Sequence, residues 1–354
     1  MSIADKTVPG ARARSRKTAR VEKISLSVRI LALIKLARPR TWIFAISMWL
    51  IAYLSTGSAQ PFICLIGVLI CAGLTAATNL FNIYTDRGED RINLPYRVQL
   101  VKQLGLPQLK TAIVFSYVLP LILALVFTNL RHTLLCTIGV LNSIFYSWGI
   151  RFKAHLFVSL LSISGVVVLP FFAGWSAVHP IQNISPVVFV FGFFFLAYAN
   201  LKNLPDVSGD KENGIRTVFT LYKQNIGAWL VCAMMIIPYG VLALLIWSDI
   251  LPQKYLSIFV MMPFLWLFWR GIPKAQTPVD REIIHALGYF YQVLLFMMLF
   301  LIYYPTLGVV ISLVILFVLT SIVEYLGIDS RPYNLRLSHL LQRRPLRVKK
   351  GSSL

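Results

Sequence analysis

The sequence predicts an all-α polytopic membrane protein, a bundle of nine to ten transmembrane helices around a central pocket. The 354 residues are 57% apolar and 13% charged, and their mean hydropathy of +0.72 lies outside the range of ordinary soluble domains. Apolar runs close to the length needed to cross a bilayer recur along the chain. The formal charge of +21 comes from Lys and Arg gathered between these runs.

Two segments precede the apolar runs. Residues 1–23 are polar and Arg-rich, so we expect a disordered basic tail. Residues 24–40 alternate apolar residues with Arg29 and Lys35, which is typical of an amphipathic helix lying on anionic lipid. A nucleic-acid-binding tail is the alternative interpretation, but a positive-inside anchor explains the charge. We therefore expect membrane lipids, and no nucleic acid, as partners.

Ten apolar segments follow within residues 41–326, the predicted transmembrane domain. Several are near the lower limit for crossing a core of ~30 Å. Only Pro305 and Thr306 separate the last two, which form a tight hairpin or one broken helix, so the count is nine or ten. The expected segments are 41–57, 61–84, 111–128, 133–149, 156–175, 185–202, 227–247, 255–270, 286–304 and 307–326.

The placement of basic residues predicts the orientation. With the N-terminus inside, nearly all Lys and Arg fall in inner loops, and the outer links carry only Arg131 and Lys254. This distribution follows the positive-inside rule. It places the N-terminus, both polar motifs described next and, with ten spans, the basic tail 327–354 in the cytoplasm.

Two acidic stretches close apolar runs on the predicted inner side. The stretches are residues 82–97 and 202–216, and they contain six of the 13 acidic residues of the chain. Carboxylates crowded at membrane helix ends indicate a cation between them. Oxygen ligands of this kind suit Mg²⁺, which also shares phosphate oxygens. The spacings of three and four residues place each set on one helical face. The two sets are Asn82, Asp86 and Asp90, and Asn203, Asp206 and Asp210.

These motifs, with Pro95 and Arg97 after the first, resemble the paired aspartate-rich motifs of the UbiA superfamily of intramembrane prenyltransferases. The resemblance covers about residues 36–305. It implies a helical bundle around a central prenyl diphosphate pocket and Mg²⁺-dependent transfer of a polyprenyl group from its diphosphate to a lipophilic, aromatic acceptor. It also implies that each acidic set binds one Mg²⁺. Asn203 departs from the family, which usually has Asp there.

Basic residues at the inner ends of the spans can bind the diphosphate oxygens that the metal leaves free. The prenyl tail can then run between apolar helices. The candidates for this role are Arg97, Arg151, Lys153, Lys202 and Arg216.

The stretch from Tyr146 to Lys153 is similar to a tyrosine-then-basic segment of the family. The resemblance implies that Tyr146 lines the reacting end and that Lys153 and Arg151 grip the diphosphate, so Tyr146 and Lys153 are the catalytic candidates. An interfacial-belt tyrosine and basic topology signals are the alternative interpretations.

The residues after the first motif bear on the acceptor. The end of the first motif, from Asn93 to Arg97, resembles the homogentisate and chlorophyll-type branches of the UbiA superfamily more than its hydroxybenzoate or haem O branches. Val98 follows where the family usually continues Pro-x-Ser-Gly. Two other functions stay open: a terpene cyclase of the same superfamily, and a cation-coupled membrane transporter. The acids lie at helix ends rather than at the bilayer midplane, which disfavours transport.

Overall fold

The computed structural model describes residues 25–307, 310–311, 314–315 and 318. Every regular element in these residues is a helix. Six helical segments are long and apolar enough to cross a membrane, so the protein is an integral membrane protein. They are α3 (Pro61–Thr85), α6 (Leu106–Phe127), α8 (Leu156–Ser176), α12 (Gln224–Trp247), the segment Gln253–Lys274 and α14 (Pro278–Tyr303).

The segment Gln253–Lys274 consists of η4 (Gln253–Met261), α13 (Pro263–Gly271) and η5 (Ile272–Lys274). Three further apolar helices lie among the long ones: α2 (Trp42–Ser55), α7 (Leu130–Ser147) and α9 (Val187–Asn203). Each of the first nine predicted apolar segments therefore coincides with helical structure. Most of the tenth, 307–326, and the predicted tails 1–23 and 327–354 lie outside the described residues.

Helix α6 begins earlier than its predicted segment, which started at residue 111. Gly105 ends the preceding helix with φ of 93°, and α6 starts at the next residue. Lys110 is the fifth residue of α6, and its ammonium packs 5.6 Å from the ring centroid of Tyr84. A long basic side chain can thus belong to a helix end while its charge remains near water.

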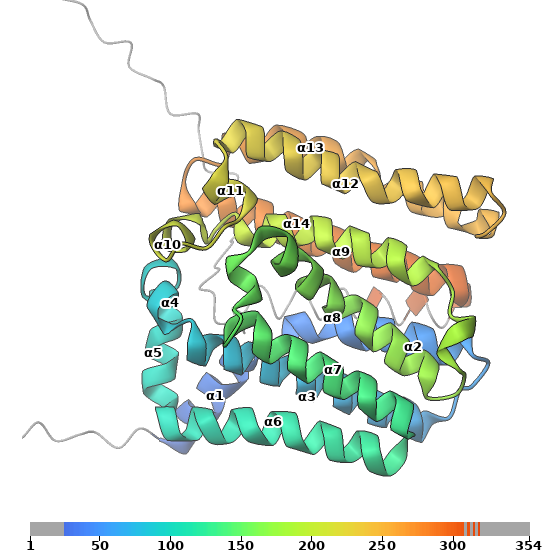
Figure 1. Ribbon diagram of the computed structural model, residues 1–354, viewed down its shortest axis with the longest axis horizontal. Coiled ribbons are helices and arrows are strands. Elements are labelled where there is room, and N and C mark those ends of the chain that lie inside the picture. Colours follow the sequence, from blue (N-terminus) through green and yellow to red (C-terminus); the bar gives the residue numbers. More distant parts are fainter. Residues whose placement is uncertain (1–24, 308–309, 312–313, 316–317, 319–354) are drawn as a thin grey trace, which may run out of the picture.

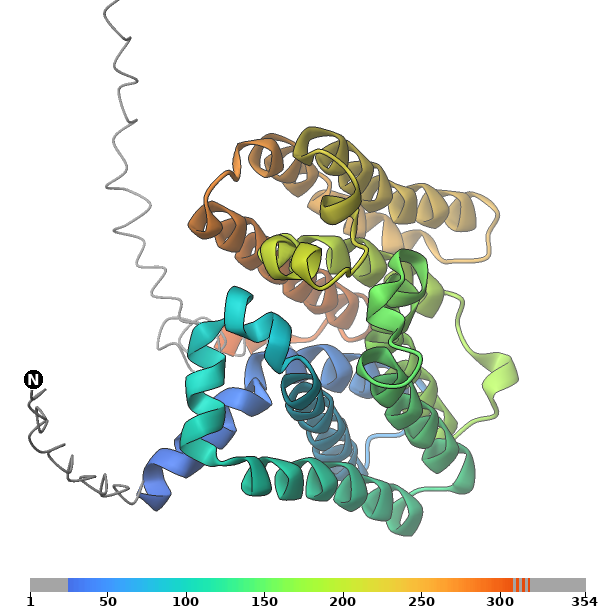
Figure 2. The same cartoon turned by 60° about the vertical axis from the view of Figure 1, so that its left-hand side comes forward.

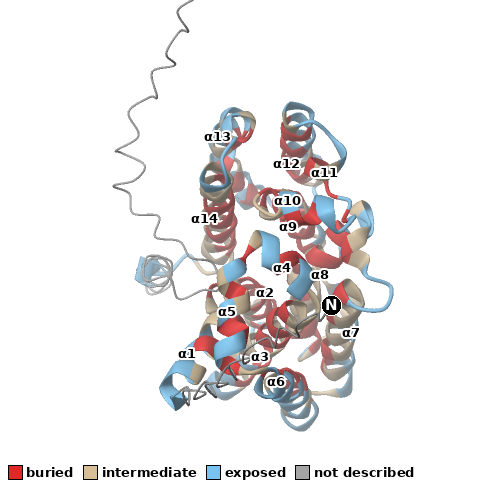
Figure 3. Cartoon of the chain, turned by 90° about the vertical axis from the view of Figure 1, so that its left-hand side faces the viewer, coloured by how far each residue is buried: buried red, intermediate tan, exposed pale blue. Residues whose placement is uncertain are grey.

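The short helices gather at one end of the bundle, where the predicted inner loops meet (Figures 1, 2 and 3). They include α1 (Leu26–Ala37), α4 (Arg87–Asn93), α5 (Pro95–Leu104), α10 (Val207–Glu212) and α11 (Val218–Leu221). The amphipathic segment predicted at 24–40 is helical in α1, which packs on α5 through a 3.0 Å hydrogen bond from Lys35 Nζ to Tyr96 Oη. Its place on the membrane surface stays a prediction.

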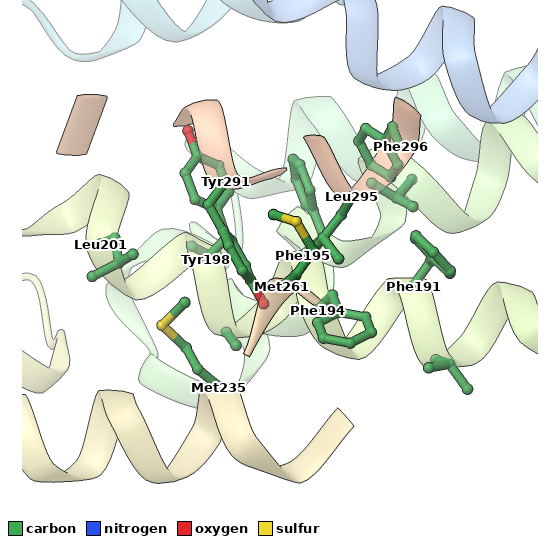
Figure 4. Close-up of a cluster of buried hydrophobic side chains, with 14 of the residues drawn as sticks. Phe191, Phe194, Phe195, Tyr198, Leu201, Met235, Met261, Tyr291, Leu295 and Phe296 are labelled. Carbon is green, nitrogen blue, oxygen red and sulfur yellow. The ribbon is translucent and has the colours of Figure 1, made fainter. Parts of the chain in front are cut away.

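An aromatic core holds α9, α12 and α14 together (Figure 4). The ring of Phe194 on α9 packs edge-on against Tyr239 on α12, with 4.8 Å between centroids. Phe191 stacks on Phe296 of α14 at 6.1 Å. Aromatic pairs contribute more than the apolar area they bury, so this core positions the end of α9, where the second acidic motif begins.

Candidate active site

Each acidic motif lies where a long apolar helix gives way to a short one. Helix α3 ends at Thr85 and Asp86 precedes α4, while α9 ends at Asn203 and Asp206 precedes α10. Both aspartates leave helical geometry, with φ and ψ of −91° and 18° and of −89° and 1°. Each motif, predicted from its spacing to share one helical face, therefore crosses a break between two helices. Backbone hydrogen bonds of 2.8 to 3.2 Å continue across both breaks and preserve the three- and four-residue spacing.

The two short helices bring the motifs face to face. The backbone N–H of Gly209 in α10 donates to Asn93 Oδ1 in α4 at 2.7 Å, across 116 residues of sequence. A Cβ at residue 209 would lie 2.5 Å from Asn93 Nδ2, so only glycine permits this approach. Figure 3 shows α4 and α10 as neighbours at the end of the bundle.

A polar cavity lies between the motifs. Ten of the twelve predicted site residues line it: Asn82, Asp86, Asp90, Arg97, Tyr146, Lys153, Lys202, Asn203, Asp206 and Asp210. Sequence reasoning assigned no site role to five further polar residues of its wall: Arg38, Glu89, Asn93, Ser159 and Thr217.

Two predicted diphosphate ligands lie away from this cavity. Arg216 is exposed on the surface. The side chain of Arg151 is 45% exposed, and its Nη2 binds Glu89 Oε1 at 2.9 Å. Diphosphate binding by these two residues stays a prediction from the sequence alone.

Lys153 connects the loop after α7 to the first motif. Its buried ammonium donates to Asp86 Oδ1 at 2.5 Å and to Glu89 Oε1 at 3.0 Å. Thr85 Oγ1 also donates to Asp86 Oδ1, at 2.8 Å. Glu89 lies three residues after Asp86, a helical spacing that could have identified it, but in this first motif the metal role was assigned to positions four apart.

The electrostatics of the cavity favour extra positive charge. Burial raises the pKa of Asp210 to about 8, with the charge of Asp206 adding to the effect. Burial likewise raises the pKa of Asp90 to about 6, although Arg97 binds both carboxylate oxygens at 2.8 and 3.1 Å. Burial also acts to raise the pKa of Glu89, but its own backbone N–H and the cations Lys153 and Arg151 lower it overall. Buried carboxylates with raised pKa values are candidates for cation binding.

A second, mainly apolar cavity adjoins the polar one and runs into the bundle, lined mainly by α2, α3, α7 and α8 and also by residues of α6, α9 and α14. Arg38, Asn82, Tyr146 and Lys202 line both cavities. At the junction, Lys202 Nζ lies 5.8 Å from the ring centroid of Tyr146. A charged head group and an apolar chain of one ligand can therefore occupy the two cavities together.

An acidic and basic cavity at one end of a membrane bundle, continued by an apolar cavity, forms a binding site suited to an anionic, amphipathic ligand. The chain belongs to the UbiA prenyltransferase family, whose model matches residues 42–284. The protein is accordingly a prenyltransferase, and the family resemblance noted in the sequence is confirmed.

Individual relatives are distant. The digeranylgeranylglyceryl phosphate synthase of Methanobrevibacter smithii is 24% identical over 249 residues, which cover 69% of this chain and 87% of the relative. A solved structure from work on digeranylgeranylglyceryl phosphate synthase in membranes has a TM-score of 0.57 at 16% identity, covering 79% of this chain and 99% of its own. A UbiA homologue from Archaeoglobus fulgidus, bound to GPP and Mg²⁺, has a TM-score of 0.56 at 17% identity, covering 75% and 99%. At these identities the two structures show the fold.

Proposed function

We propose that this protein transfers a polyprenyl group from its diphosphate to a lipophilic acceptor, with Mg²⁺ held by the two acidic motifs. One observation carries the proposal: the cavity that holds both motifs opens onto the apolar cavity at Tyr146 and Lys202. A prenyl diphosphate has the same division, with its charge at one end and a hydrocarbon chain at the other. The diphosphate would occupy the polar cavity and the chain the apolar one.

The residues of the polar cavity fit Mg²⁺. Asp210 is buried beside Asp206, and a cation between the two carboxylates offsets both the burial and the repulsion. Within the described residues, no three His, Cys, Asp or Glu side chains form a metal-binding group of their own. Mg²⁺ needs no such group, because it binds through one or two carboxylates and completes its shell with water and substrate phosphates. Bound there, it would neutralise the charge of the departing diphosphate.

The basic residues of the wall have separate tasks in this proposal. Lys153 and Lys202 would bind diphosphate oxygens, because both line the polar cavity and Lys202 also lies at the junction. Arg97 would instead position Asp90, which it binds through both carboxylate oxygens. Tyr146 lies at the junction, where the carbon that breaks from the diphosphate would lie, and its ring would help to keep water from that carbon.

Two acceptor classes merit testing. The sequence predicts an aromatic acceptor. The name of the Methanobrevibacter relative suggests a glyceryl phosphate lipid instead, and two cations on the wall of the apolar cavity, Arg38 and Arg40, favour an anionic acceptor group.

The function is tested with the purified full-length protein, radiolabelled geranylgeranyl diphosphate, and one acceptor from each class. We expect a labelled lipid product with Mg²⁺ or Mn²⁺ and none in excess EDTA, because the carboxylates would lose the cation that binds the diphosphate. Full turnover in excess EDTA would show that the reaction does not need a divalent cation. A labelled product that forms equally well without any acceptor would support the terpene cyclase instead, and ion flux in liposomes without label transfer would support the transporter.

We also propose that the motif end of the bundle faces the cytoplasm and that the chain has ten spans. We expect cysteines introduced at Gln99, Asn213 and Pro345 to be protected from a membrane-impermeant thiol reagent on intact cells, with Lys254→Cys as the labelled outer control. The reason is the concentration of Lys and Arg in the loops at this end. Labelling at positions 99 and 213 would show that the motif end faces outward. Labelling at 345 alone would show that the chain has nine spans.

A further inference from the structure

We propose that Trp49 sets the length of prenyl chain that this enzyme accepts, because its indole closes the outer end of the apolar cavity. This inference rests on the proposed function, since it requires the donor chain to occupy that cavity.

On four of the helices that line the cavity, the lining stops short of the predicted outer end of the helix. Its outermost lining residues are Trp49 on α2, Ile70 on α3, Leu135 on α7 and Ala173 on α8. The residues about one turn further out on each helix are buried and do not line the cavity. They are Tyr53, Gly67, His132 and Ser176. Trp49 has by far the largest side chain of the four at this boundary.

Trp49 is held firmly in that place. Its side chain is 1% exposed, its Nε1 donates to His132 Nε2 at 2.9 Å, and its indole stacks on Tyr53 with 5.0 Å between centroids. A Cβ at Gly67 would lie 2.3 Å from the indole, and one at Gly174 would lie 2.3 Å from the Trp49 carbonyl oxygen. Two glycines thus form the slot that receives this residue. A side chain fixed by a hydrogen bond, a ring stack and close packing is a rigid barrier.

The barrier limits the chain to a defined depth. The lining of α7 extends from Leu135 to Tyr146 at the junction with the polar cavity, which is about 16 Å along a helix axis. A donor with its diphosphate in the polar cavity therefore has a fixed distance for its chain before it meets Trp49. Each added isoprene unit beyond that distance must displace packed side chains, which is unfavourable.

Gly139 is a position at which a larger side chain could shorten the apolar cavity. It lines the cavity on α7 about a third of the way from Leu135 to Tyr146. A Cβ at this position has Leu169 Cδ1 as its nearest neighbour, at 4.0 Å, so a larger side chain can be added there and would enter the cavity. Removing the indole should lengthen the space for the chain, and filling the space at residue 139 should shorten it.

The test is equilibrium binding of unreactive thiolodiphosphate analogues of geranyl, farnesyl and geranylgeranyl diphosphate, with Mg²⁺, to the full-length protein in detergent. The readout is the affinity ratio between the longest and the shortest analogue, which needs no acceptor. We expect Trp49→Leu to raise this ratio and Gly139→Leu to lower it, each by on the order of tenfold or more, since a single methylene in an apolar pocket changes discrimination by about 10–200-fold.

Matched controls are Trp247→Leu and Gly240→Leu, at exposed positions of α12 that line neither cavity, and both should keep the wild-type ratio. If Trp49→Leu does not fold, Gly139→Leu tests the depth by itself. An unchanged ratio in the folded variants, or an equal loss of affinity for all three analogues, would overturn the role of Trp49 while leaving the proposed function intact. Failure of the wild-type protein to bind any analogue would instead overturn the proposed function.

Discussion

Asp86→Asn and Asp206→Asn are each expected to reduce prenyl transfer by about 10²–10³-fold, while the protein remains folded in the membrane. Removing one donor that stabilises developing charge costs about 2.7–4 kcal/mol, and we expect loss of the bound cation to cost as much. Both aspartates line the polar cavity and stand at equivalent breaks, before α4 and before α10. Asparagine has nearly the same shape but no charge, so the variants should lose the cation rather than the fold.

The measurement is initial rate at saturating donor, together with thermal stability. Glu212→Gln is the matched control, because this acid is exposed on α10 and lines neither cavity; it should keep its activity. A solvated acid at a helix end would change stability by less than about 1 kcal/mol. Wild-type turnover in both aspartate variants would show that the active site has been assigned to the wrong residues.

Lys153→Met is expected to weaken donor binding by about 10²-fold and to lower stability as well. The ammonium is buried and binds Asp86 and Glu89, and breaking a buried ion pair by removing one partner costs about 3–5 kcal/mol. Loss of a charge-assisted contact to the diphosphate would account for the weaker binding. Isothermal titration with a donor analogue and thermal unfolding measure the two effects separately.

A double variant separates the structural role of Lys153 from its proposed role in binding. Lys153 is one of the groups that lower the pKa of Glu89, so Lys153→Met leaves a buried carboxylate without this compensation. Adding Glu89→Gln removes that charge and should restore much of the stability. Donor binding should stay weak in the double variant if Lys153 binds the diphosphate, and recovery of binding would show that it acts only on the fold. Lys211→Met, at an exposed position on α10, is the control.

The sequence by itself determined the class of protein and predicted most of the polar residues that line the cavity between the motifs. Apolar runs of spanning length predicted the helices, because the bilayer leaves few ways to satisfy backbone hydrogen bonds. The spacing of three and four residues predicted which acids act together, and all six residues chosen in this way line one cavity. Local periodicity was sufficient for these conclusions because each motif lies within a few turns of chain.

The tertiary structure alone decided how the charges from different helices meet. Lys153 reaches Asp86 across 67 residues and Arg151 reaches Glu89 across 62, while Arg97 turns to Asp90 and Arg216 faces outward. The closure of the apolar cavity by Trp49 likewise depends on Gly67 and Gly174, which lie on two other helices. A sequence shows which residues share a helical face, but the pairing of charges and the depth of a cavity depend on how separate helices pack.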